Sequence, residues 1–206
     1  MEIVVGTQQE LGQARLLQMD RYRYRVFVDT LGWELACDPG RERDQFDHDE
    51  TLYVLACNDQ EQVIGTARVL PTNQRYLLAE VFPQLMGDQT LPCDSRIWEL
   101  SRFSAMDFGL AGRTSGGQFS SVVATQLLDA VLRCAAARGV RQLITVSPLG
   151  IERLLRRAGY RARRAAAPMR VGDHWLFACW IDVPTQACTI GEVTDVADYR
   201  SIHRAA

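Results

Sequence analysis

The segment Trp98-Glu-Leu-Ser-Arg-Phe103 carries side chains suited to proton transfer and to charge stabilisation. A carboxylate such as Glu99 can remove a proton from a nucleophile, directly or through a water molecule. Because the pattern is extended, Ser101 shares the face of Glu99, and Leu100 and Arg102 point to the other face. A lone strand glutamate is more often an ion-pair partner, Ser101 could be merely a small strand residue, and a strand arginine is often a solvated edge charge, so both interpretations stay open here.

A second group of charges combines acids from one segment with arginines from elsewhere in the chain. Glu42, Asp44 and Asp47 lie close together after the turn residues Asp38-Pro39-Gly40. With Arg23 and Arg68 they can form an ion-pair network that shapes a pocket, and carboxylates suit a cationic ligand. The alternative is a solvated loop, which is what a run of charges usually forms.

Three aromatic residues accompany these charges: Phe27, Trp33 and Phe82. Each could be an ordinary core residue, and for Phe27, on the apolar face of a predicted helix, that explanation is sufficient. Trp33 differs because it adjoins Gly32 at the start of the charged segment. An indole there can stack on a flat or cationic ligand.

The region from Arg138 to Arg170 holds nine arginines and a single acid, Glu152. Arg153, Arg156 and Arg157 fall on one predicted helix, whose spacing keeps at least the first and last of them together. Such a face would attract an acidic partner by electrostatic steering. A solvated helix face is the alternative. Nucleic-acid binding is not predicted, because aromatic interleaving and a recognisable nucleic-acid motif are both missing.

Alternating strand and helix patterns must position these residues. The predicted strands are Ile3–Val5, Leu52–Cys57, Val63–Leu70, Ile97–Ala105, Gln142–Ser147 and Trp175–Val183. The predicted helices run from Leu11 to Phe27, from Tyr76 to Met86, from Gln118 to Arg138, and from a first turn containing Pro148 to Gly159. We expect an α/β fold in one domain over residues 1–183, a three-layer α-β-α sandwich with a mixed, largely antiparallel sheet, followed by a tail of unassigned role over residues 184–206.

Composition limits the classes of function. A net charge of −2 over 206 residues does not fit a general polyanion binder. The N-terminus has neither a basic leader nor a long apolar core, and no apolar run is long enough to cross a membrane, so a cytoplasmic protein without a membrane partner is expected. The six cysteines show no metal-ligand spacing and are predicted to be buried free thiols, so no metal site is expected.

Five motifs, in order over the first half of the chain, resemble the acyl-homoserine lactone synthases, bacterial enzymes that make quorum-sensing autoinducers. They are Arg23-Tyr-Arg-Val-Phe27 with Leu31-Gly-Trp33, Glu42-Arg-Asp-Gln-Phe-Asp47, Gly65-Thr-Ala-Arg-Val-Leu-Pro-Thr72, Val81-Phe-Pro83 and Trp98-Glu-Leu-Ser-Arg-Phe103. The second half matches more loosely, as far as residue 183. The resemblance implies the fold of the coenzyme A-dependent N-acetyltransferases.

The resemblance also implies a reaction. The amine of S-adenosylmethionine attacks an acyl thioester, and the methionyl carboxylate then displaces methylthioadenosine to close the lactone. Glu99 would be the general base, Ser101 would hold a relay water, and Arg102 would belong to the functional core. The charged network and the three aromatic residues would form the S-adenosylmethionine pocket. No cofactor is implied, since S-adenosylmethionine is a substrate and phosphopantetheine arrives on the donor.

The acyl group would lie in a pocket that suits a medium-length chain, with Thr145 able to hydrogen-bond an oxygen at acyl C3. By resemblance the pocket residues are Phe103, Thr145, Ser147, Ile151, Leu154 and Leu155. The donor would be an acidic acyl carrier protein docking on Arg153, Arg156 and Arg157. The segment Arg113-Thr-Ser-Gly-Gly-Gln118 matches the coenzyme A pyrophosphate loop only in part, because Gln118 replaces a small residue, and this favours the carrier protein over coenzyme A.

Two other functions stay open from the sequence. The first is an N-acyltransferase that uses acyl-coenzyme A and a different amine, and it predicts no methylthioadenosine. The second is a non-enzymatic binding module that uses the arginine-rich region on a partner. It leaves the charged segment and the Trp98–Phe103 motif unexplained and therefore ranks below both enzymes.

Overall fold

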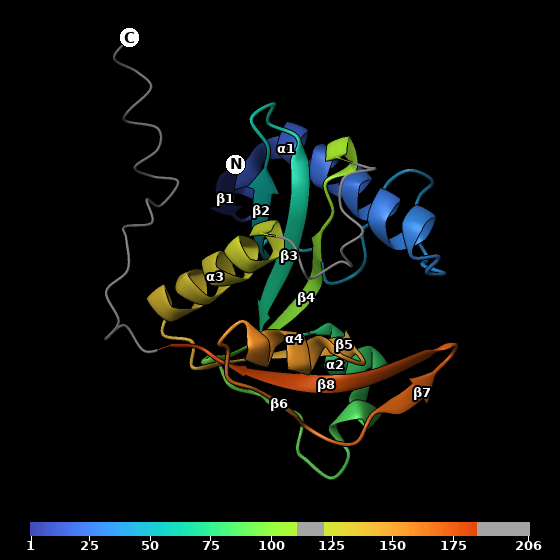
Figure 1. The fold of residues 1–206 in the computed structure, drawn as a ribbon, viewed down its shortest axis with the longest axis vertical. Helices are drawn as coiled ribbons and strands as arrows, with labels where there is room; N and C mark the ends of the chain where they lie inside the picture. Colours follow the sequence, from blue (N-terminus) through green and yellow to red (C-terminus); the bar gives the residue numbers. More distant parts are fainter. Residues whose placement is uncertain (111–121, 185–206) are drawn as a thin grey trace.

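The computed structural model describes residues 1–110 and 122–184 of the chain, with the side chains of Leu110 and Leu154 excepted. Its frame is one eight-stranded sheet of order β1-β2-β3-β4-β5-β8-β6, with β7 paired to β8 (Figure 1). The strands are β1 Glu2–Gly6, β2 Leu52–Cys57, β3 Val63–Pro71, β4 Ile97–Ala105, β5 Gln142–Pro148, β6 Ala162–Arg164, β7 Met169–Val171 and β8 His174–Asp182.

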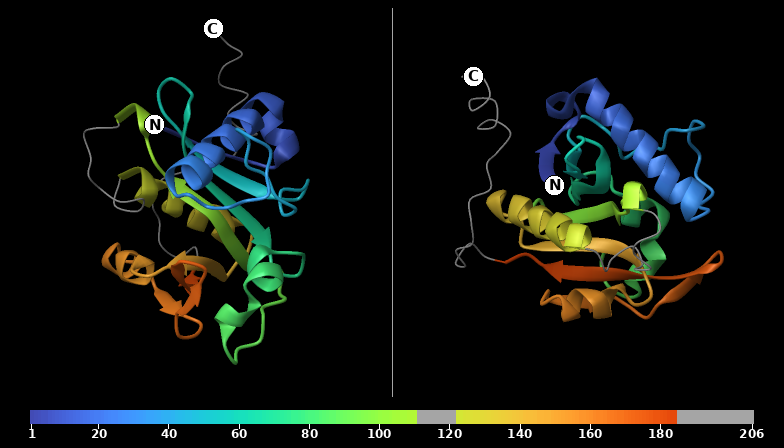
Figure 2. Two further views of the ribbon diagram at one scale, coloured as in Figure 1. Left: turned by 90° about the vertical axis from the view of Figure 1, so that its right-hand side faces the viewer. Right: turned by 45° about the horizontal axis from the view of Figure 1, so that its top comes forward.

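Helical segments cover both faces of this sheet. They are α1 Gln8–Arg23, the π-helix η1 Tyr24–Thr30, α2 Leu77–Val81, the 3₁₀ helices η2 Pro83–Met86 and η3 Phe108–Leu110, α3 Val122–Ala137 and α4 Ile151–Arg157. Tyr53 and Leu55 of β2 pack under α1, whereas Val54 between them packs with α3. Alternate residues of a strand thus feed two cores, with α1 and α3 on opposite sides (Figure 2). The predicted three-layer α/β sandwich is confirmed.

The predicted mixed, largely antiparallel sheet is also confirmed. The sole parallel ladder in the described sheet joins β4 to β5, and it covers Ile97–Glu99 against Gln142–Ile144. Both strands continue beyond it, β4 to Ala105 and β5 to Pro148. The second halves of these two strands are therefore not paired with each other, which leaves a gap in the backbone pairing between β4 and β5, and Glu99 is the last residue of β4 that pairs with β5.

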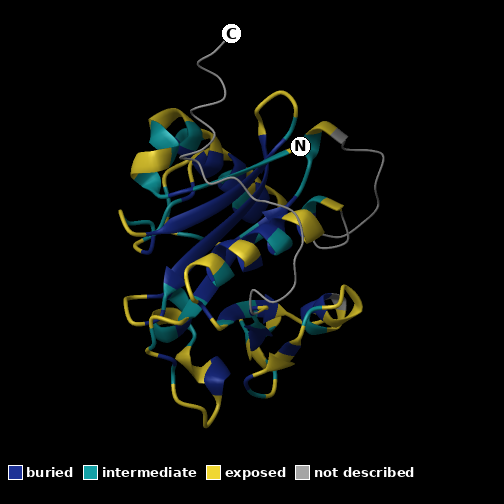
Figure 3. Cartoon of the chain, turned by 90° about the vertical axis from the view of Figure 1, so that its left-hand side faces the viewer, coloured by how far each residue is buried: buried dark blue, intermediate teal, exposed yellow. Residues whose placement is uncertain are grey.

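The interior is apolar except near the middle strands. Figure 3 shows buried strands through the centre of the molecule, with exposed residues concentrated in the loops and outer helix faces. Several charged residues are nevertheless fully buried: Asp20, Arg23, Arg68 and Glu99 each have 0% exposure. Buried charges require partners, and for Arg23 and Arg68 the acids of the loop between η1 and β2 can supply them. No helix among residues 1–110 and 122–184 is long and apolar enough to span a bilayer.

Some predicted elements needed correction. The helix expected to reach Phe27 becomes a π-helix from Tyr24 onward. The helix expected over Tyr76–Met86 divides into α2 and η2 at Pro83, whose missing N–H cannot continue the ladder. Pro148 ends β5, and α4 begins only at Ile151. The short strands β6 and β7 were missed, because three-residue strands rich in arginine give little apolar alternation.

The long helix and the cysteines show further differences. α3 begins at Val122, and residues 118–121 of the predicted helix lie outside the described part of the chain. Gly139 has a φ of 75°, as its predicted role at the helix end requires. Cys57, Cys134 and Cys179 are buried as predicted, but Cys93 is exposed and Cys37 only partly buried. Both lie in loops, where the apolar flanks that bury the other thiols are absent.

Candidate active site

Arg23 is the centre of a buried ion-pair network at the end of α1. Its Nη1 and Nη2 donate to the two carboxylate oxygens of Asp47 over 2.8 and 3.0 Å, and its Nε donates to Glu42. Burial alone would raise the pKa of Asp47, but the charges of Arg23 and Arg68 hold that pKa well below its ordinary value. Asp47 is therefore ionised at neutral pH, and its ion pair with Arg23 ties the loop after η1 to the helix.

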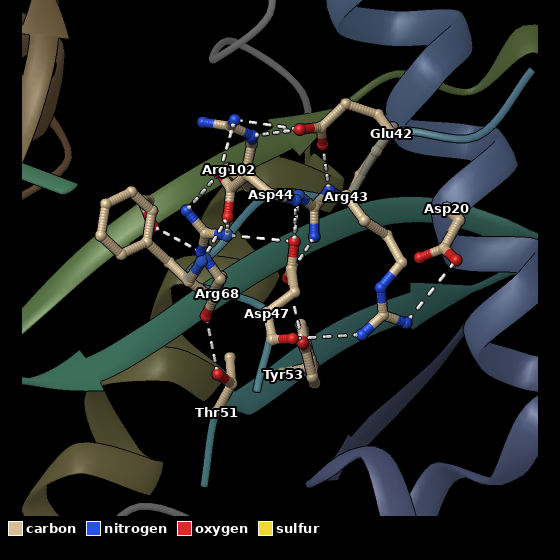
Figure 4. Close-up of polar contacts among 12 residues, drawn as sticks. Asp20, Glu42, Arg43, Asp44, Asp47, Thr51, Tyr53, Arg68 and Arg102 are labelled. Atoms are coloured by element: carbon tan, nitrogen blue, oxygen red, sulfur yellow. Dashed lines mark hydrogen bonds and ion pairs between the residues drawn. The ribbon is translucent and has the colours of Figure 1, made fainter. Parts of the chain in front are cut away.

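A second half of the network comes from the middle strands. Arg68 of β3 holds Asp44 with two nitrogens and donates from Nε to the hydroxyl of Ser101 over 3.0 Å. Arg102 of β4 donates to Asp44 over 2.8 Å and to Glu42 over 2.9 Å. Three arginines thus alternate with three carboxylates (Figure 4). The predicted network exists, and the solvated-loop interpretation is wrong.

Strict alternation predicts that Arg102 points to the opposite face from Ser101. In the structure it does not. The β3–β4 register shifts between Thr66 and Arg68, so that Ala67 alone faces Arg102 and Phe103 together. Arg102 has a φ of 50°, the left-handed conformation that a bulge accommodates. The bulge turns its side chain toward the loop acids. A non-glycine residue held at this φ is strained, and such strain concentrates at functional sites.

Glu99 is placed differently from Arg102, the other charged residue of its motif. It shares a face with Ser101, as predicted, and Leu100 packs on the α3 side. Its two oxygens accept hydrogen bonds from the backbone N–H groups of Leu77 and Leu78, over 3.0 and 2.6 Å. Burial raises the pKa of Glu99 to about 7, although these two hydrogen bonds oppose the rise. A carboxyl group with this pKa can accept a proton near neutral pH.

The aromatic residues separate into two groups. Phe27 and Trp33 stack with ring centroids 4.9 Å apart, and the guanidinium of Arg102 lies 5.6 Å from the Phe27 centroid on the network side. Phe27 thus links the network to the entrance of the loop. Phe82 packs instead around α2 and η2, in the cluster of Leu78, Leu85 and Trp180. The structure therefore brings Phe27 and Trp33 together but places Phe82 in a different cluster.

Residues that were not predicted from the sequence extend the network at its outer edge. Asp20 of α1 is buried and lies 3.2 Å from Arg41 and 3.7 Å from Arg43. Its Oδ1 has no hydrogen-bond partner among the described residues, and burial raises its pKa. Beside this pair of arginines is a hollow of about 470 Å³, lined also by Ala36, Cys37 and Asp38. The one sequence signal was that Asp20 precedes Arg23 by a helical turn.

The predicted acyl-pocket residues gather on the opposite face of the sheet from α1. Phe103, Ile151 and Leu155 pack in the core under α3 and α4. Thr145 and Ser147 are buried on β5, beyond the end of its ladder with β4, and alternate onto the same face as Leu143. Thr145 makes one long hydrogen bond, 3.4 Å to the carbonyl of Val146. The side chain of Leu154 lies outside the described part of the structure.

The predicted docking arginines lie on the outside of α4. Arg153, Arg156 and Arg157 are all exposed. Glu152 binds Arg156 and Arg164, over 2.9 and 2.7 Å, and so neutralises part of the face. Arg163 does not belong to this face, because its guanidinium lies over Trp180 on the α2 side. The segment Arg113–Gln118 lies outside the described residues.

These features define a class of protein. A mixed sheet whose single parallel pair separates at the centre, covered by helices on both faces, is the acyltransferase fold of the N-acetyltransferases. A protein of Lactobacillus plantarum assigned as an N-acetyltransferase superposes with a TM-score of 0.58 at 19% identity, over 89% of this chain and 98% of that one. This likeness establishes the fold, and the buried network distinguishes the site.

Comparison at the sequence level identifies the family. Residues 7–189 match the autoinducer synthase family model. The acyl-homoserine-lactone synthase of Acinetobacter nosocomialis is 49% identical over 183 residues, which cover 89% of this chain and 100% of that protein. The chain therefore belongs to the acyl-homoserine lactone synthases and is an acyltransferase.

Solved structures agree. TofI, in a ternary complex with an inhibitor and MTA, is 41% identical with a TM-score of 0.74, over 89% of this chain and 92% of that one. MesI, a CoA-dependent acyl-homoserine lactone synthase, is 31% identical with a TM-score of 0.75, over 89% of both chains.

Proposed function

We propose that this enzyme transfers a medium-chain acyl group from acyl carrier protein to the amine of S-adenosylmethionine, closes the lactone and releases methylthioadenosine. The supporting observation is that charged residues from four separate segments meet in one buried network. They are Arg23 of α1, the acids of the loop, Arg68 of β3 and Arg102 of β4. Burying these charges costs desolvation free energy, and we take this cost as support for a functional role of the network.

The network acts mainly by shaping the S-adenosylmethionine pocket. Its three carboxylates are engaged by three arginines, so the network is neutral as a whole and serves to fix the loop beside the sulfonium cation. Trp33 is only partly buried and can offer an aromatic face to this cation, while the buried Phe27 stacks on it and holds it in place. The TofI complex supports this assignment, because methylthioadenosine is the part of S-adenosylmethionine that the reaction releases.

Glu99 serves as the general base. The substrate amine is mostly protonated at neutral pH and must lose a proton before it can attack. Glu99 accepts that proton directly, or through a water held by Ser101, whose hydroxyl is oriented by Arg68. The free amine adds to the thioester carbonyl and expels the thiol. The methionyl carboxylate then attacks the γ-carbon of the methionyl chain, the bond from this carbon to the sulfonium sulfur breaks, and the lactone forms as methylthioadenosine leaves.

The gap between β4 and β5 admits the acyl donor. The thioester would lie at the end of the β4–β5 ladder, near Glu99, and the acyl chain would extend toward Thr145, Ile151 and Leu155. The thiol arm arrives with the donor, so the protein needs no cofactor of its own. S-adenosylmethionine and acyl carrier protein both belong to the cytoplasm, so we propose that the reaction takes place there.

Carrier protein is favoured as the donor because Arg153 and Arg157 are exposed and have no ion pair among the described residues. Reversing both charges should raise the KM for acyl carrier protein more than the KM for S-adenosylmethionine, which binds elsewhere. Arg21→Glu, an exposed arginine of α1, is the matched control. Equal effects on both KM values would remove α4 from donor docking. MesI is CoA-dependent, so coenzyme A thioesters must be compared directly.

The decisive experiment is mass spectrometry of the products. The purified full chain is incubated with S-adenosylmethionine and carrier-protein thioesters from C4 to C14, with the matching coenzyme A thioesters in parallel. Acyl-homoserine lactone together with methylthioadenosine supports the proposal and identifies chain length and donor. An acylated amine without methylthioadenosine would favour an N-acyltransferase for another amine. Products from coenzyme A thioesters alone would replace the donor but keep the reaction.

A further inference from the structure

Two large apolar side chains are exposed together at one end of the sheet. Trp175, near the start of β8, is 53% exposed, and Leu149, in the turn between β5 and α4, is 50% exposed. They are neighbours, because Pro148 pairs with Leu176 at the end of the β5–β8 ladder. An exposed tryptophan beside an exposed leucine leaves apolar area in contact with water, and such patches often mark a binding site for a partner.

This pair lies on the face of the sheet that carries α4. Phe177 packs in the core with Ile151 and Leu155 of α4. Trp175 precedes Phe177 by two residues on β8, so its side chain leaves the sheet on the same side. Figure 1 shows α4 over β8, with the β7–β8 hairpin extending beyond it. The apolar pair therefore lies on the same face of the sheet as α4 and its arginines.

Arginines lie on the same face as the apolar pair. Arg170 is the cross-strand partner of Trp175, and its side chain is 66% exposed, with Asp173 at 3.3 Å. Arg153 and Arg157 of α4 are exposed without an ion pair in the described chain. An apolar centre with an arginine rim matches the usual composition of strong binding sites.

The turn that carries Leu149 also leads to the predicted acyl pocket. Ser147 is buried on β5 two residues before Leu149, and Ile151 is buried two residues after it. A donor docked on Leu149 and Trp175 would thus be next to the pocket that receives its acyl chain. This position selects the acyl donor as the occupant over a partner unrelated to the reaction.

We propose that Trp175 and Leu149 form an apolar anchor for acyl carrier protein, whereas the arginines of α4 steer its approach. The inference rests on the proposed function, since it assumes that donor. The two parts act on different rates: opposite charges accelerate association and are screened by salt, and a buried tryptophan slows dissociation. The rim and the anchor can therefore be separated by experiment.

Steady-state kinetics with a carrier-protein thioester, at low and high salt, tests the anchor. Trp175→Ala should raise the KM for this donor roughly tenfold, the effect of one central contact of about 1.4 kcal/mol. The kcat, the KM for S-adenosylmethionine and the salt slope should stay unchanged. Leu149→Ser should act in the same direction. Arg153→Glu with Arg157→Glu should instead flatten the salt dependence.

Met169→Ala is the matched control. Met169 is 41% exposed on the same hairpin, but it pairs with Leu176, which packs on the α2 side. It should not change the donor KM. An unchanged donor KM in both Trp175→Ala and Leu149→Ser would overturn the anchor while leaving the enzyme's reaction intact. No lactone from the wild-type chain with any carrier-protein thioester would instead contradict the proposed function.

A second measurement tests whether this surface binds a membrane instead, because tryptophan beside arginine also suits an anionic lipid surface. Flotation with vesicles of phosphatidylglycerol and phosphatidylethanolamine should recover little wild-type protein. Vesicle binding that Trp175→Ala abolishes, together with an unchanged KM for the carrier protein, would overturn the proposal in favour of a lipid contact.

Discussion

The carboxylate of Glu99 accepts a hydrogen bond from the backbone N–H of Leu78 over 2.6 Å, and thereby fixes the beginning of α2 to the centre of the sheet. Its second oxygen accepts from Leu77 over 3.0 Å. Glu99 is therefore both the anchor of a five-residue helix and the proposed base. A variant that removes the negative charge but retains the size of the side chain separates these roles.

Glu99→Gln should reduce turnover by at least a hundredfold, because an amide cannot accept the amine proton. The amide oxygen can still accept from one backbone N–H, and losing the other hydrogen bond should cost roughly 1–3 kcal/mol of stability. Single-turnover lactone formation and circular dichroism measure the two effects. Near-normal turnover in a folded variant would exclude Glu99 as the base.

The pH dependence of stability should reveal the unusual environment of Glu99. Its pKa is raised from an ordinary 4.5 to about 7, so the folded state holds the proton more tightly than the unfolded state does. The stability associated with the protonated carboxyl is complete below about pH 4.5 and is lost as the pH rises through about 7. The total change is roughly 3 kcal/mol at most.

Urea denaturation of the wild type and of Glu99→Gln between pH 5 and pH 8 isolates this effect. The amide side chain of the variant cannot ionise, so the wild type should lose stability relative to the variant as the pH rises. Other titrating groups are common to both proteins and cancel in the difference. A constant difference across this range would mean that the pKa of Glu99 is not raised.

The network at Arg23 should be essential for the fold of the loop. Asp47→Asn removes the carboxylate that Arg23 holds with two nitrogens and leaves buried positive charge uncompensated, which should cost about 3–5 kcal/mol. Asp59→Asn is the control, since the Asp59 side chain is 95% exposed in its pair with the N-terminus. It should change stability by less than about 1 kcal/mol. Similar midpoints for both variants in urea would contradict this account.

The sequence motifs predicted which residues meet, but not how each is oriented. Arg23, Glu42, Asp44 and Asp47 were found because their charges are dense and their spacing matches a family. The direction of Arg102 depends on a bulge, and a bulge depends on how two strands pair, which no local pattern in either strand records.

The remaining differences have the same physical origin. Asp20 was not predicted as a site residue, because its arginine partners follow it by about twenty residues, on a loop whose path only the fold determines. The capping role of Glu99 also arises from contacts distant in sequence, since α2 precedes β4 by a long loop. The layers and the strand order follow from periodicity far more directly than the side-chain contacts do.

Thr145 should determine whether the enzyme prefers an oxygen at acyl C3. Thr145 is buried, and among the described residues its hydroxyl makes only a 3.4 Å hydrogen bond to the carbonyl of Val146, so it is available to a ligand. Thr145→Val keeps the shape but removes the donor. The kcat/KM for a 3-oxo or 3-hydroxy thioester should fall by up to about tenfold, equivalent to one hydrogen bond, and that for the unsubstituted thioester should not.

Thr66→Val is the matched control for this change. Thr66 is also buried, its hydroxyl has no partner among the described residues, and β3 places it away from α4. It should leave the ratio of the two kcat/KM values unchanged. A pair of competition assays with mixed thioesters, read by mass spectrometry of the lactones, gives this ratio directly. If Thr145→Val lowers both kcat/KM values equally, the residue supports the shape of the pocket and does not recognise the C3 oxygen.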